Sequence, residues 1–274
     1  MDAPLLTGQR QTLIREWLAR DGRVLAVRLA DAFGVSEDTI RRDLRELAAR
    51  GECRRVYGGA LPFAPQVGTL SERRDQMVAR KTRLAERIVT GVMPGSTLFI
   101  DAGSTNLLVA ERLPPGSGLT VVTNAPAIAC ALQDKPGVAT VLLGGRLHGE
   151  SGACLGSQTL REAERLRPTV LVLGACGLDA EAGITAHHPE EAELKGSLAE
   201  RAGEVWVAAT TDKFTTAASF TVAPARRLAR LVVEHDCDAA LVEPFAALGI
   251  ACERAEAPSA VEGPRLRRAA SRAA

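Results

Sequence analysis

From about residue 75 onward, short unbroken apolar runs alternate with amphipathic stretches, and this alternation limits the fold more than any other feature of the chain. Unbroken apolar strands separated by helices are typical of a mostly parallel sheet that is covered on both faces. Ligands bind such sheets outside the carboxyl ends of the strands. The sequence therefore predicts an α/β domain over residues 75–253 with a small-molecule site at one sheet edge. The predicted strands are 97–100, 119–122, 138–143, 169–173, 205–209 and 231–233.

Polar or glycine-rich residues follow four of these runs. Residues 101–106 (Asp-Ala-Gly-Ser-Thr-Asn) follow the first, Thr123-Asn124 the second, Gly144-Gly145 the third and residues 174–179 the fourth. A loop of small residues at a helix start presents N–H groups and hydroxyls at the positive end of the helix, which suits a phosphate. The first loop alone is explained equally well as a structural turn, but four such endings at one edge predict a pocket.

The preceding segment, residues 7–50, is predicted to form three short helices. The third begins at Ser36, a good N-cap, and its apolar residues Ile40, Leu44 and Leu47 form one stripe. The opposite side would carry arginines that can enter a DNA major groove, and a short hairpin or wing after the helix would reach the DNA backbone. The candidate DNA-binding residues are Ser36, Asp38, Thr39, Arg41, Arg42, Arg45, Arg54 and Arg55.

A solvated charged face on a three-helix bundle explains the same pattern without DNA. Glu37, Asp38, Asp43 and Glu46 dilute the positive charge of the third helix. Charge totals do not separate the two interpretations, because residues 1–60 carry 11 Arg and Lys against 9 Asp and Glu, a net of +2. The whole chain is nearly neutral at +1, so any DNA contact depends on where the charges are placed.

The third helix and its surroundings resemble the DeoR family of bacterial repressors. Residues 35–44 (Val-Ser-Glu-Asp-Thr-Ile-Arg-Arg-Asp-Leu), followed by Leu47, Gly51 and Gly58-Gly59-Ala60, follow the family signature without a gap. The resemblance implies a winged helix-turn-helix that binds double-stranded operator DNA, and it favours repression. Such modules usually bind paired half-sites, so we expect a homo-oligomer, a dimer or a tetramer. Tyr57 stands where the family usually has histidine, a departure that we expect to alter only a backbone contact.

The later landmarks also resemble the DeoR effector domain. They include the segment 101–105, Glu191-Ala192-Glu193-Leu194-Lys195 and Lys213-Phe214. The resemblance implies a fold like that of ribose-5-phosphate isomerase and a phosphorylated sugar or related metabolite as inducer. The family's D-x-S-K becomes Thr-Thr-Asp-Lys over residues 210–213, so the effector is expected to differ from the usual ones. The candidate effector-binding residues are Asp101, Gly103, Ser104, Thr105, Asn124, Gly144, Gly145, Gly174, Asp179, Glu191, Lys195 and Lys213.

A second hypothesis is a sugar-phosphate isomerase-like enzyme fused to a DNA-binding module. Asp101, Asp179, Glu191 and Lys195 could move protons next to a carbonyl. The same residues could instead bind hydroxyls and phosphate without turnover. The DNA-binding module explains the domain as a sensor, so we expect no catalytic residues and no enzyme activity.

Neither a metal nor a cofactor is expected. The six cysteines are scattered without a C-x-x-C pair, which fits reduced thiols in the cytoplasm. His187-His188-Pro189 lacks the helical spacing of a zinc motif and instead predicts a helix start at Pro189. No apolar run is long enough for a membrane span, and no secretory signal opens the chain.

The pattern divides the chain into four parts. Residues 1–60 form the predicted DNA-binding domain, 61–74 a linker, 75–253 the effector-sensing domain and 254–274 a disordered basic tail. Basic residues within 265–272 could touch DNA, although a solvated tail explains them equally simply.

Overall fold

The N-terminal domain is a winged helix-turn-helix. The computed structural model describes residues 5–65 and 68–257. Three helices pack around one core, and a small antiparallel sheet with strand order β1-β3-β2 forms the wing. This confirms the three predicted helices and the hairpin, whereas the two-residue strand β1 was too short to carry a pattern. The elements are α1 (Thr7–Asp21), β1 (Val24–Leu25), α2 (Ala26–Phe33), α3 (Glu37–Ala49), β2 (Arg54–Val56) and β3 (Gly59–Leu61).

The boundaries of α3 follow from its sequence. Ser36 is the N-cap, and its hydroxyl accepts a hydrogen bond from the Thr39 backbone N–H at 3.3 Å. Ile40, Leu44 and Leu47 are all buried in the core of the small domain, as their spacing predicted. The opposite face of α3 is therefore left to solvent.

The larger domain is built on a seven-stranded sheet with strand order β15-β14-β12-β9-β4-β5-β6. Every neighbouring pair in it is parallel, which confirms the predicted α/β class. The six predicted strands are all present. The seventh, β15, was missed because Ala-Cys-Glu-Arg is half polar, as suits an edge strand. The strands are β4 (Thr97–Ile100), β5 (Leu119–Thr123), β6 (Val138–Leu142), β9 (Val170–Leu173), β12 (Glu204–Ala209), β14 (Arg230–Val233) and β15 (Ala251–Arg254).

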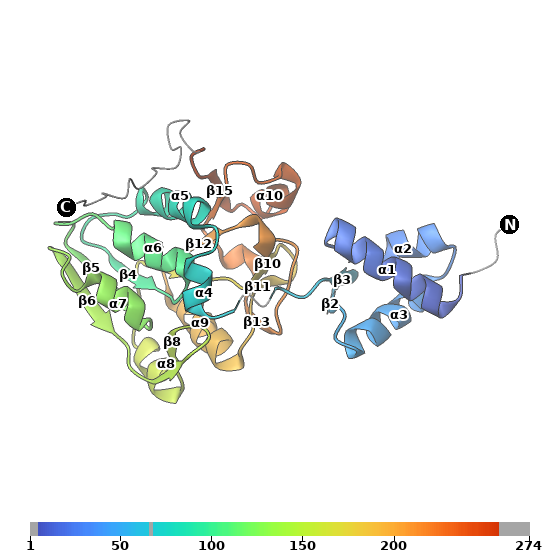
Figure 1. Ribbon diagram of the computed structural model, residues 1–274, viewed down its shortest axis with the longest axis horizontal. Helices are drawn as coiled ribbons and strands as arrows, with labels where there is room; N and C mark the ends of the chain where they lie inside the picture. The colour runs from blue at the N-terminus through green and yellow to red at the C-terminus, as the bar shows by residue number, and fades with distance from the viewer. Residues whose placement is uncertain (1–4, 66–67, 258–274) are drawn as a thin grey trace, which may run out of the picture.

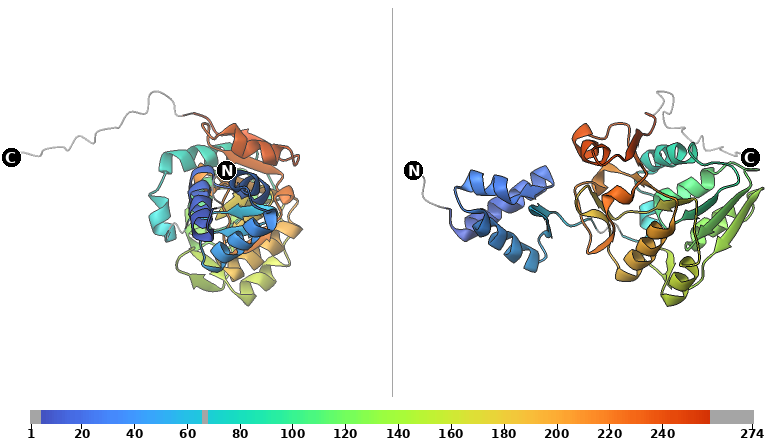
Figure 2. Two further views of the ribbon diagram at one scale, coloured as in Figure 1. Left: turned by 90° about the vertical axis from the view of Figure 1, so that its right-hand side faces the viewer. Right: turned by 180° about the vertical axis from the view of Figure 1, so that it is seen from behind.

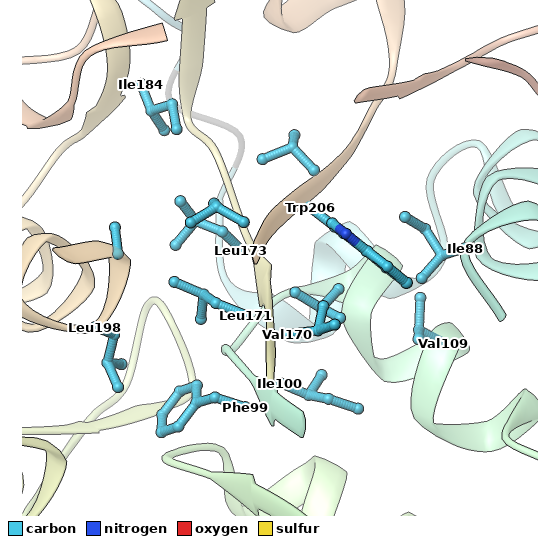
Figure 3. Close-up of a cluster of buried hydrophobic side chains, with 14 of the residues drawn as sticks. Ile88, Phe99, Ile100, Val109, Val170, Leu171, Leu173, Ile184, Leu198 and Trp206 are labelled. Atoms are coloured by element: carbon cyan, nitrogen blue, oxygen red, sulfur yellow. The ribbon is translucent and has the colours of Figure 1, made fainter. Parts of the chain in front are cut away.

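Helices cover both faces of this sheet (Figure 1). Figure 3 shows Ile88 and Val109 beside Trp206 at one face, while Leu198 lies with Phe99 at the other. All five side chains are buried, because both faces of a parallel sheet are excluded from water. The helices are α4 (Leu70–Arg74), α5 (Val78–Val89), α6 (Ser104–Arg112), α7 (Pro126–Leu132), α8 (Ser157–Ala163), α9 (Pro189–Arg201) and α10 (Ala239–Ala246).

Two small antiparallel units, neither of which was predicted, lie outside the main sheet. One is the hairpin of β7 (Arg146–His148) and β8 (Ala153–Leu155). The other is a three-stranded sheet with order β10-β11-β13. Its strands are β10 (Gly177–Asp179), β11 (Gly183–Ala186) and β13 (Phe220–Ala223).

The element bounds differ from the predicted domain limits at three places. Strand β3 runs one residue past the expected end at 60, and Leu61 is buried. Helix α4 lies inside the stretch 61–74 that we expected to be a linker. Arg254 belongs to β15 and Ala255 is buried, so the first residues of the expected tail are ordered parts of the domain. Residues 258–274, including the basic segment 265–272, lie outside the described residues.

The wing of the N-terminal domain is turned toward the larger domain (Figures 1 and 2). The chain that leaves the wing pairs with the segment before β13. Ala64 N–H donates to the Ala217 carbonyl at 3.1 Å, and Ala217 N–H donates to the Pro62 carbonyl at 3.2 Å. An ion pair adds a second link, with Arg23 Nη1 at 3.6 Å from Asp179 Oδ2. The two domains are thus joined by backbone hydrogen bonds as well as by the covalent chain.

Candidate functional site

The solvent face of α3 carries three exposed arginines. Arg41 and Arg42 have side chains that are 54% and 78% exposed, and Arg45 is exposed beside them. Asp38 and Thr39 lie at the start of the same helix, next to the N-cap Ser36. The structure thus brings the predicted recognition residues to one accessible face of a helix long enough to enter a major groove.

The acidic residues of α3 have two kinds of partner: Glu37 and Asp38 pair with Arg41 on the exposed face, at 2.7 and 3.4 Å, whereas others contact α1. Asp43 is buried, and its carboxylate accepts hydrogen bonds from Arg10 Nε at 2.7 Å and Nη2 at 3.2 Å. Glu46 accepts a hydrogen bond from Gln11 Nε2 at 2.8 Å, so it is tied to α1. Asp43 therefore does not dilute the charge of the exposed face; it fastens α3 to α1. Glu46 Oε1 also lies 3.7 Å from Arg42 Nε, so Arg41 and Arg42 both keep acidic partners, and the charge of α3 does not by itself distinguish a DNA-binding face from a solvated one.

The wing carries the remaining predicted DNA contacts. Arg54 is half-buried on β2, whereas Arg55 is exposed. Tyr57, the residue that replaces the usual histidine, lies at the turn between β2 and β3 and is 94% exposed. Gly59 must be glycine, because a Cβ there would lie 1.9 Å from the Val24 carbonyl oxygen of the neighbouring strand. The glycine therefore lets β3 approach β1 and hold the wing against the helices.

A cavity of about 100 Å³ lies at the carboxyl ends of the central strands. Its wall includes the loop after β4 and the loop after β9, two adjacent strands from which the chain winds outward in opposite directions. This is the topological switch point at which parallel sheets bind ligands. The predicted residues that line it are Gly103, Ser104, Thr105, Gly174, Glu191, Lys195 and Lys213.

Five predicted effector contacts are not among the described residues that line this cavity. Asn124 donates to the Cys154 carbonyl at 3.3 Å, and Gly144 and Gly145 follow β6, two strands away from the switch point. Asp179 accepts backbone N–H bonds from Glu181 and Ala182 in a turn and faces Arg23 of the N-terminal domain. Asp101 lies beneath the cavity and is 1% exposed.

A buried ionic triad lies at the cavity, with Glu191 and Lys195 in its wall and Asp101 behind them. Lys195 Nζ lies 3.1 Å from Asp101 Oδ2, 2.5 Å from Glu191 Oε1 and 2.7 Å from the Gly174 carbonyl oxygen. An ammonium has three N–H donors, so these three acceptors use all of them. Asp101 also accepts the Gly174 N–H at 3.1 Å. The triad holds the loops after β4 and β9 together.

The three members of the triad titrate differently. Burial would lower the pKa of Lys195, but Asp101 and Glu191 outweigh burial and raise it. Burial would raise the pKa of Glu191, yet Lys195 outweighs it and the pKa is lowered. For Asp101 burial prevails over Lys195, and the pKa is raised. Two carboxylates share one ammonium, and the more deeply buried carboxylate is the one pushed toward its neutral form.

Sequence reasoning missed two cations of the cavity wall. Lys81 of α5 is buried, and its ammonium donates to the Arg73 carbonyl at 2.7 Å. Burial, aided by the nearby Lys213, lowers the pKa of Lys81. Arg73 itself belongs to α4 and also lines the cavity. Both residues precede the first strand of the sheet, in a region where no motif singled out either side chain.

The departure at residues 210–213 has a structural counterpart. Lys213 Nζ pairs with Asp212 Oδ2 at 3.1 Å, at the cavity wall. Burial alone would raise the pKa of Asp212, but Thr210 and Lys213 outweigh it and hold the pKa below its ordinary value. Glu234, which follows β14, accepts the Thr211 backbone N–H at 2.8 Å. Glu234, just after the neighbouring strand, therefore anchors the turn in which the family's first acidic residue is absent.

Helix α9 begins as the sequence predicted. Pro189 is its first residue, His188 is the N-cap, and Glu190 and Glu191 lie in its first turn. Pro at the first position and acids in the first turn both favour a helix start.

An exposed recognition helix with a wing, joined to an α/β domain with a cavity at its switch point, defines a DNA-binding transcriptional regulator with a sensor domain. Comparison with protein families identifies the family of regulators to which the chain belongs. Residues 76–235 match the DeoR C-terminal sensor domain and residues 10–64 match the DeoR-like helix-turn-helix domain, so the chain belongs to the DeoR family.

Curated relatives agree with this assignment. The chain is 35% identical to the HTH-type transcriptional regulator GlpR of Haloferax volcanii, over 76% of this chain and 82% of that protein. It is 33% identical to the glycerol-3-phosphate regulon repressor of Escherichia coli K12, over 75% and 82% of the two chains. It is 28% identical to a putative aga operon transcriptional repressor of Escherichia coli O157:H7, over 89% and 92%.

Among solved structures, ribose-5-phosphate isomerase A of Methanocaldococcus jannaschii matches with a TM-score of 0.36 and 14% identity, over 50% of this chain and 54% of that one. This likeness is too slight to carry an argument about chemistry. No helix within residues 5–65 and 68–257 has the length and apolar character that crossing a membrane requires.

Proposed function

We propose that this regulator represses a carbohydrate-catabolic operon and is released from its operator by a phosphorylated sugar or a related metabolite. The observation that carries the proposal is the cavity at the switch point, where the first turn of α6 meets Lys81 and Lys213. Backbone N–H groups at a helix start and nearby cations both attract phosphate. Two relatives, the glycerol-3-phosphate regulon repressor and the putative aga operon transcriptional repressor, support the same class of target.

Within this cavity we assign direct effector contacts to the loop after β4 and to two lysines that each have one observed partner, Lys213 with Asp212 and Lys81 with the Arg73 carbonyl. Gly103, Ser104 and Thr105 would bind phosphate through the α6 N-terminus, and Lys213 and Lys81 would supply charge. Lys195, Asp101 and Glu191 would instead position the loops, because the ammonium has no N–H left to offer. We assign no direct effector contact to the four predicted residues that lie outside this cavity, Asn124, Gly144, Gly145 and Asp179.

For DNA we propose that Arg41, Arg42 and Arg45 enter the major groove while Arg54 and Arg55 contact phosphates. Ser36, Asp38 and Thr39 would fix the start of the helix against the groove. A single small module makes few contacts, so specific binding would need two copies on paired half-sites in a homo-oligomer. The operator would be double-stranded DNA in the cytoplasm.

The segment between the cavity and the N-terminal domain offers a route for the response. Lys213 lines the cavity, and its carbonyl accepts a hydrogen bond from the Thr216 hydroxyl at 2.9 Å. The next residue, Ala217, pairs with the chain that leaves the wing. Any effector that moves Lys213 would therefore disturb the backbone pairing that holds the wing. An effector acts only if it binds the DNA-competent and DNA-incompetent states with different affinity.

We propose that the sensor domain does not catalyse sugar-phosphate isomerisation. Asp101 and Glu191 both accept hydrogen bonds from the Lys195 ammonium, whose three N–H donors are all in use. Asp179 lies at the domain junction rather than in the cavity. A turnover assay with pentose and hexose phosphates would detect the alternative directly.

The experiment that tests the proposal is a gel mobility-shift titration of the full-length protein on DNA upstream of its own operon. A panel of sugar phosphates and their unphosphorylated parents would be added. We expect one or more phosphorylated compounds to release the DNA, and the parent sugars to have no effect. Release by a parent sugar alone would contradict the effector class.

A further inference from the structure

Three side chains with metal-ligating atoms converge at the cavity wall from two separate parts of the chain. His148 ends β7, Glu150 lies in the turn after it, and His188 is the N-cap of α9. One ligating atom from each residue lies within 4.8 Å of the other two. His188 Nε2 and Glu150 Oε2 are only 3.4 Å apart.

We propose that His148, Glu150 and His188 bind a divalent transition-metal ion of the zinc type. Two imidazoles and one carboxylate are a donor set that Zn²⁺ accepts, with a fourth position left open. With bonds of about 2.0–2.2 Å, two tetrahedral ligands stand roughly 3.3–3.6 Å apart. The pair formed by Glu150 and His188 already has this spacing, and closing the remaining distances needs a movement of about 1 Å.

Ser151 and Arg73 surround the three ligands. The Ser151 backbone N–H donates to His148 Nδ1 at 3.3 Å, and Ser151 Oγ lies 3.0 Å from the same nitrogen. Nδ1 therefore accepts in this structure, and ligation through Nε2 requires the tautomer that carries its proton on Nδ1 and donates it to Ser151 Oγ. Arg73 donates to the carbonyls of Glu150 and Ser151 at 3.3 and 3.5 Å, which fixes the turn that carries the glutamate. The glutamate is exposed and both histidines are half-buried, so an ion can enter.

The sequence did not show this site because its members are distant along the chain. His187-His188 lacks the spacing of a helical zinc motif, and the neighbouring His187 serves another purpose, with Nε2 3.2 Å from the Pro65 carbonyl. Only the fold brings the β7–β8 turn against the start of α9.

An ion here would lie at the wall of the effector cavity, which Glu150, Ser151 and His188 also line. It would add positive charge there, and its open position could take an oxygen of a bound molecule. The site is independent of the proposed function, since metal binding can be measured with no effector and no DNA present.

The same three residues also have an interpretation without metal. The rings of His148 and His188 meet edge-to-face with centroids 4.5 Å apart, and Glu150 can pair with a protonated His188. The two interpretations differ in whether the cluster takes up an ion stoichiometrically.

The test is titration of full-length, metal-free protein with Co²⁺, followed by visible absorption, and with Zn²⁺, followed by calorimetry. We expect one ion per chain, with cobalt d–d bands of nitrogen and oxygen ligation and without a thiolate charge-transfer band. H188Q and H148Q should each weaken binding by more than about tenfold, since loss of even an outer partner costs roughly 10–100-fold. E150Q, at an exposed position, provides a third variant that preserves the fold.

The matched control is H235Q. His235 also neighbours a carboxylate, 3.8 Å from Asp236, and its side chain is 35% exposed against 34% for His188. This variant should bind like the wild type. The proposal would be overturned by an absence of saturable binding or by a thiolate signature. It would also be overturned if H188Q, H148Q and E150Q bound the metal as tightly as the wild type.

Discussion

Arg10 of α1 and Asp43 of α3 form a buried, two-pronged ion pair, with Nε 2.7 Å from Oδ2 and Nη2 3.2 Å from Oδ1. Their side chains are 9% and 2% exposed, so water screens the pair very little. The aspartate that follows Arg41 and Arg42 therefore points into the domain, away from the exposed face of α3. It links α3 to α1.

Removing that aspartate should destabilise the small domain. Asp43→Ala leaves the Arg10 guanidinium buried without its partner, which costs about 3–5 kcal/mol in such sites. The measurement is equilibrium unfolding in denaturant. Asp38→Ala is the control, because the Asp38 side chain is 89% exposed, and it should unfold like the wild type. Equal stability of the two variants would show that the pair does not hold α3.

Arg42→Ala should weaken operator binding without loss of stability. Its side chain is 78% exposed and lies on the face of α3 opposite the core, and a bidentate base contact is worth ~1–3 kcal/mol. Fluorescence anisotropy at one salt concentration measures the change. Arg161→Ala, an exposed arginine of α8, is the matched control. If Arg42→Ala bound as tightly as Arg161→Ala, the assigned role would be wrong.

Lys213 and Lys195 should respond differently to substitution. Lys213→Ala should leave operator binding nearly intact and abolish release by the effector, because its ammonium lines the cavity with one partner, Asp212. Lys195→Ala should unfold at lower denaturant concentration, since it leaves two buried carboxylates uncompensated. Mobility shifts and unfolding curves of both variants check this. Normal release by Lys213→Ala would remove that lysine from the effector site.

The two carboxylates of the triad should show opposite pH effects. The pKa of Glu191 is lowered in the folded state, so its contribution is complete above pH 4.5, its ordinary value, and is lost as the pH falls through the lowered one. The stability gap between wild type and Glu191→Gln should therefore shrink below pH 4.5. The pKa of Asp101 is raised by burial, so its ionisation costs stability as the pH rises above 3.8.

Unfolding measured between acid and neutral pH separates these effects. Asp101→Asn should gain on the wild type as the pH rises, while Glu191→Gln should fall behind it. Parallel pH profiles for the two variants would contradict the different environments of the two carboxylates.

Arg23→Ala should weaken the coupling between effector binding and operator binding. Arg23 pairs with Asp179 across the domain junction, at 3.6 Å, and contacts Glu181 as well. Loss of these contacts should leave effector binding unchanged but alter how far the effector reduces operator affinity. Calorimetry on the free protein and anisotropy on the complex measure the two quantities. An unchanged response in the variant would mean that coupling does not pass through Arg23.

The helices of the small domain and six of seven parallel strands were predictable, because continuous apolar runs and cap residues such as Ser36 are local signals. Strand β15 was not, since half of its residues are polar. The placement of Asp43 was also missed, because its partner Arg10 lies 33 residues away. A charged residue's direction depends on such long-range packing.

The sequence predicted a cavity at the carboxyl edge of the sheet but only some of the residues that line it. The loops after β4 and β9 meet there, as expected of strands that adjoin in the sheet. Gly144 and Gly145 end a strand that proves to lie farther along the sheet, and strand order is not encoded in any local pattern. Lys81 joins the wall from a helix that precedes the whole sheet.

The most direct test of the account is the effect of phosphorylated sugars on operator binding by the full-length protein, measured by anisotropy on its own upstream DNA. The account predicts sequence-specific binding that at least one phosphorylated sugar weakens and that Lys213→Ala makes unresponsive. Binding that no phosphorylated metabolite alters, or an absence of sequence-specific binding, would contradict it.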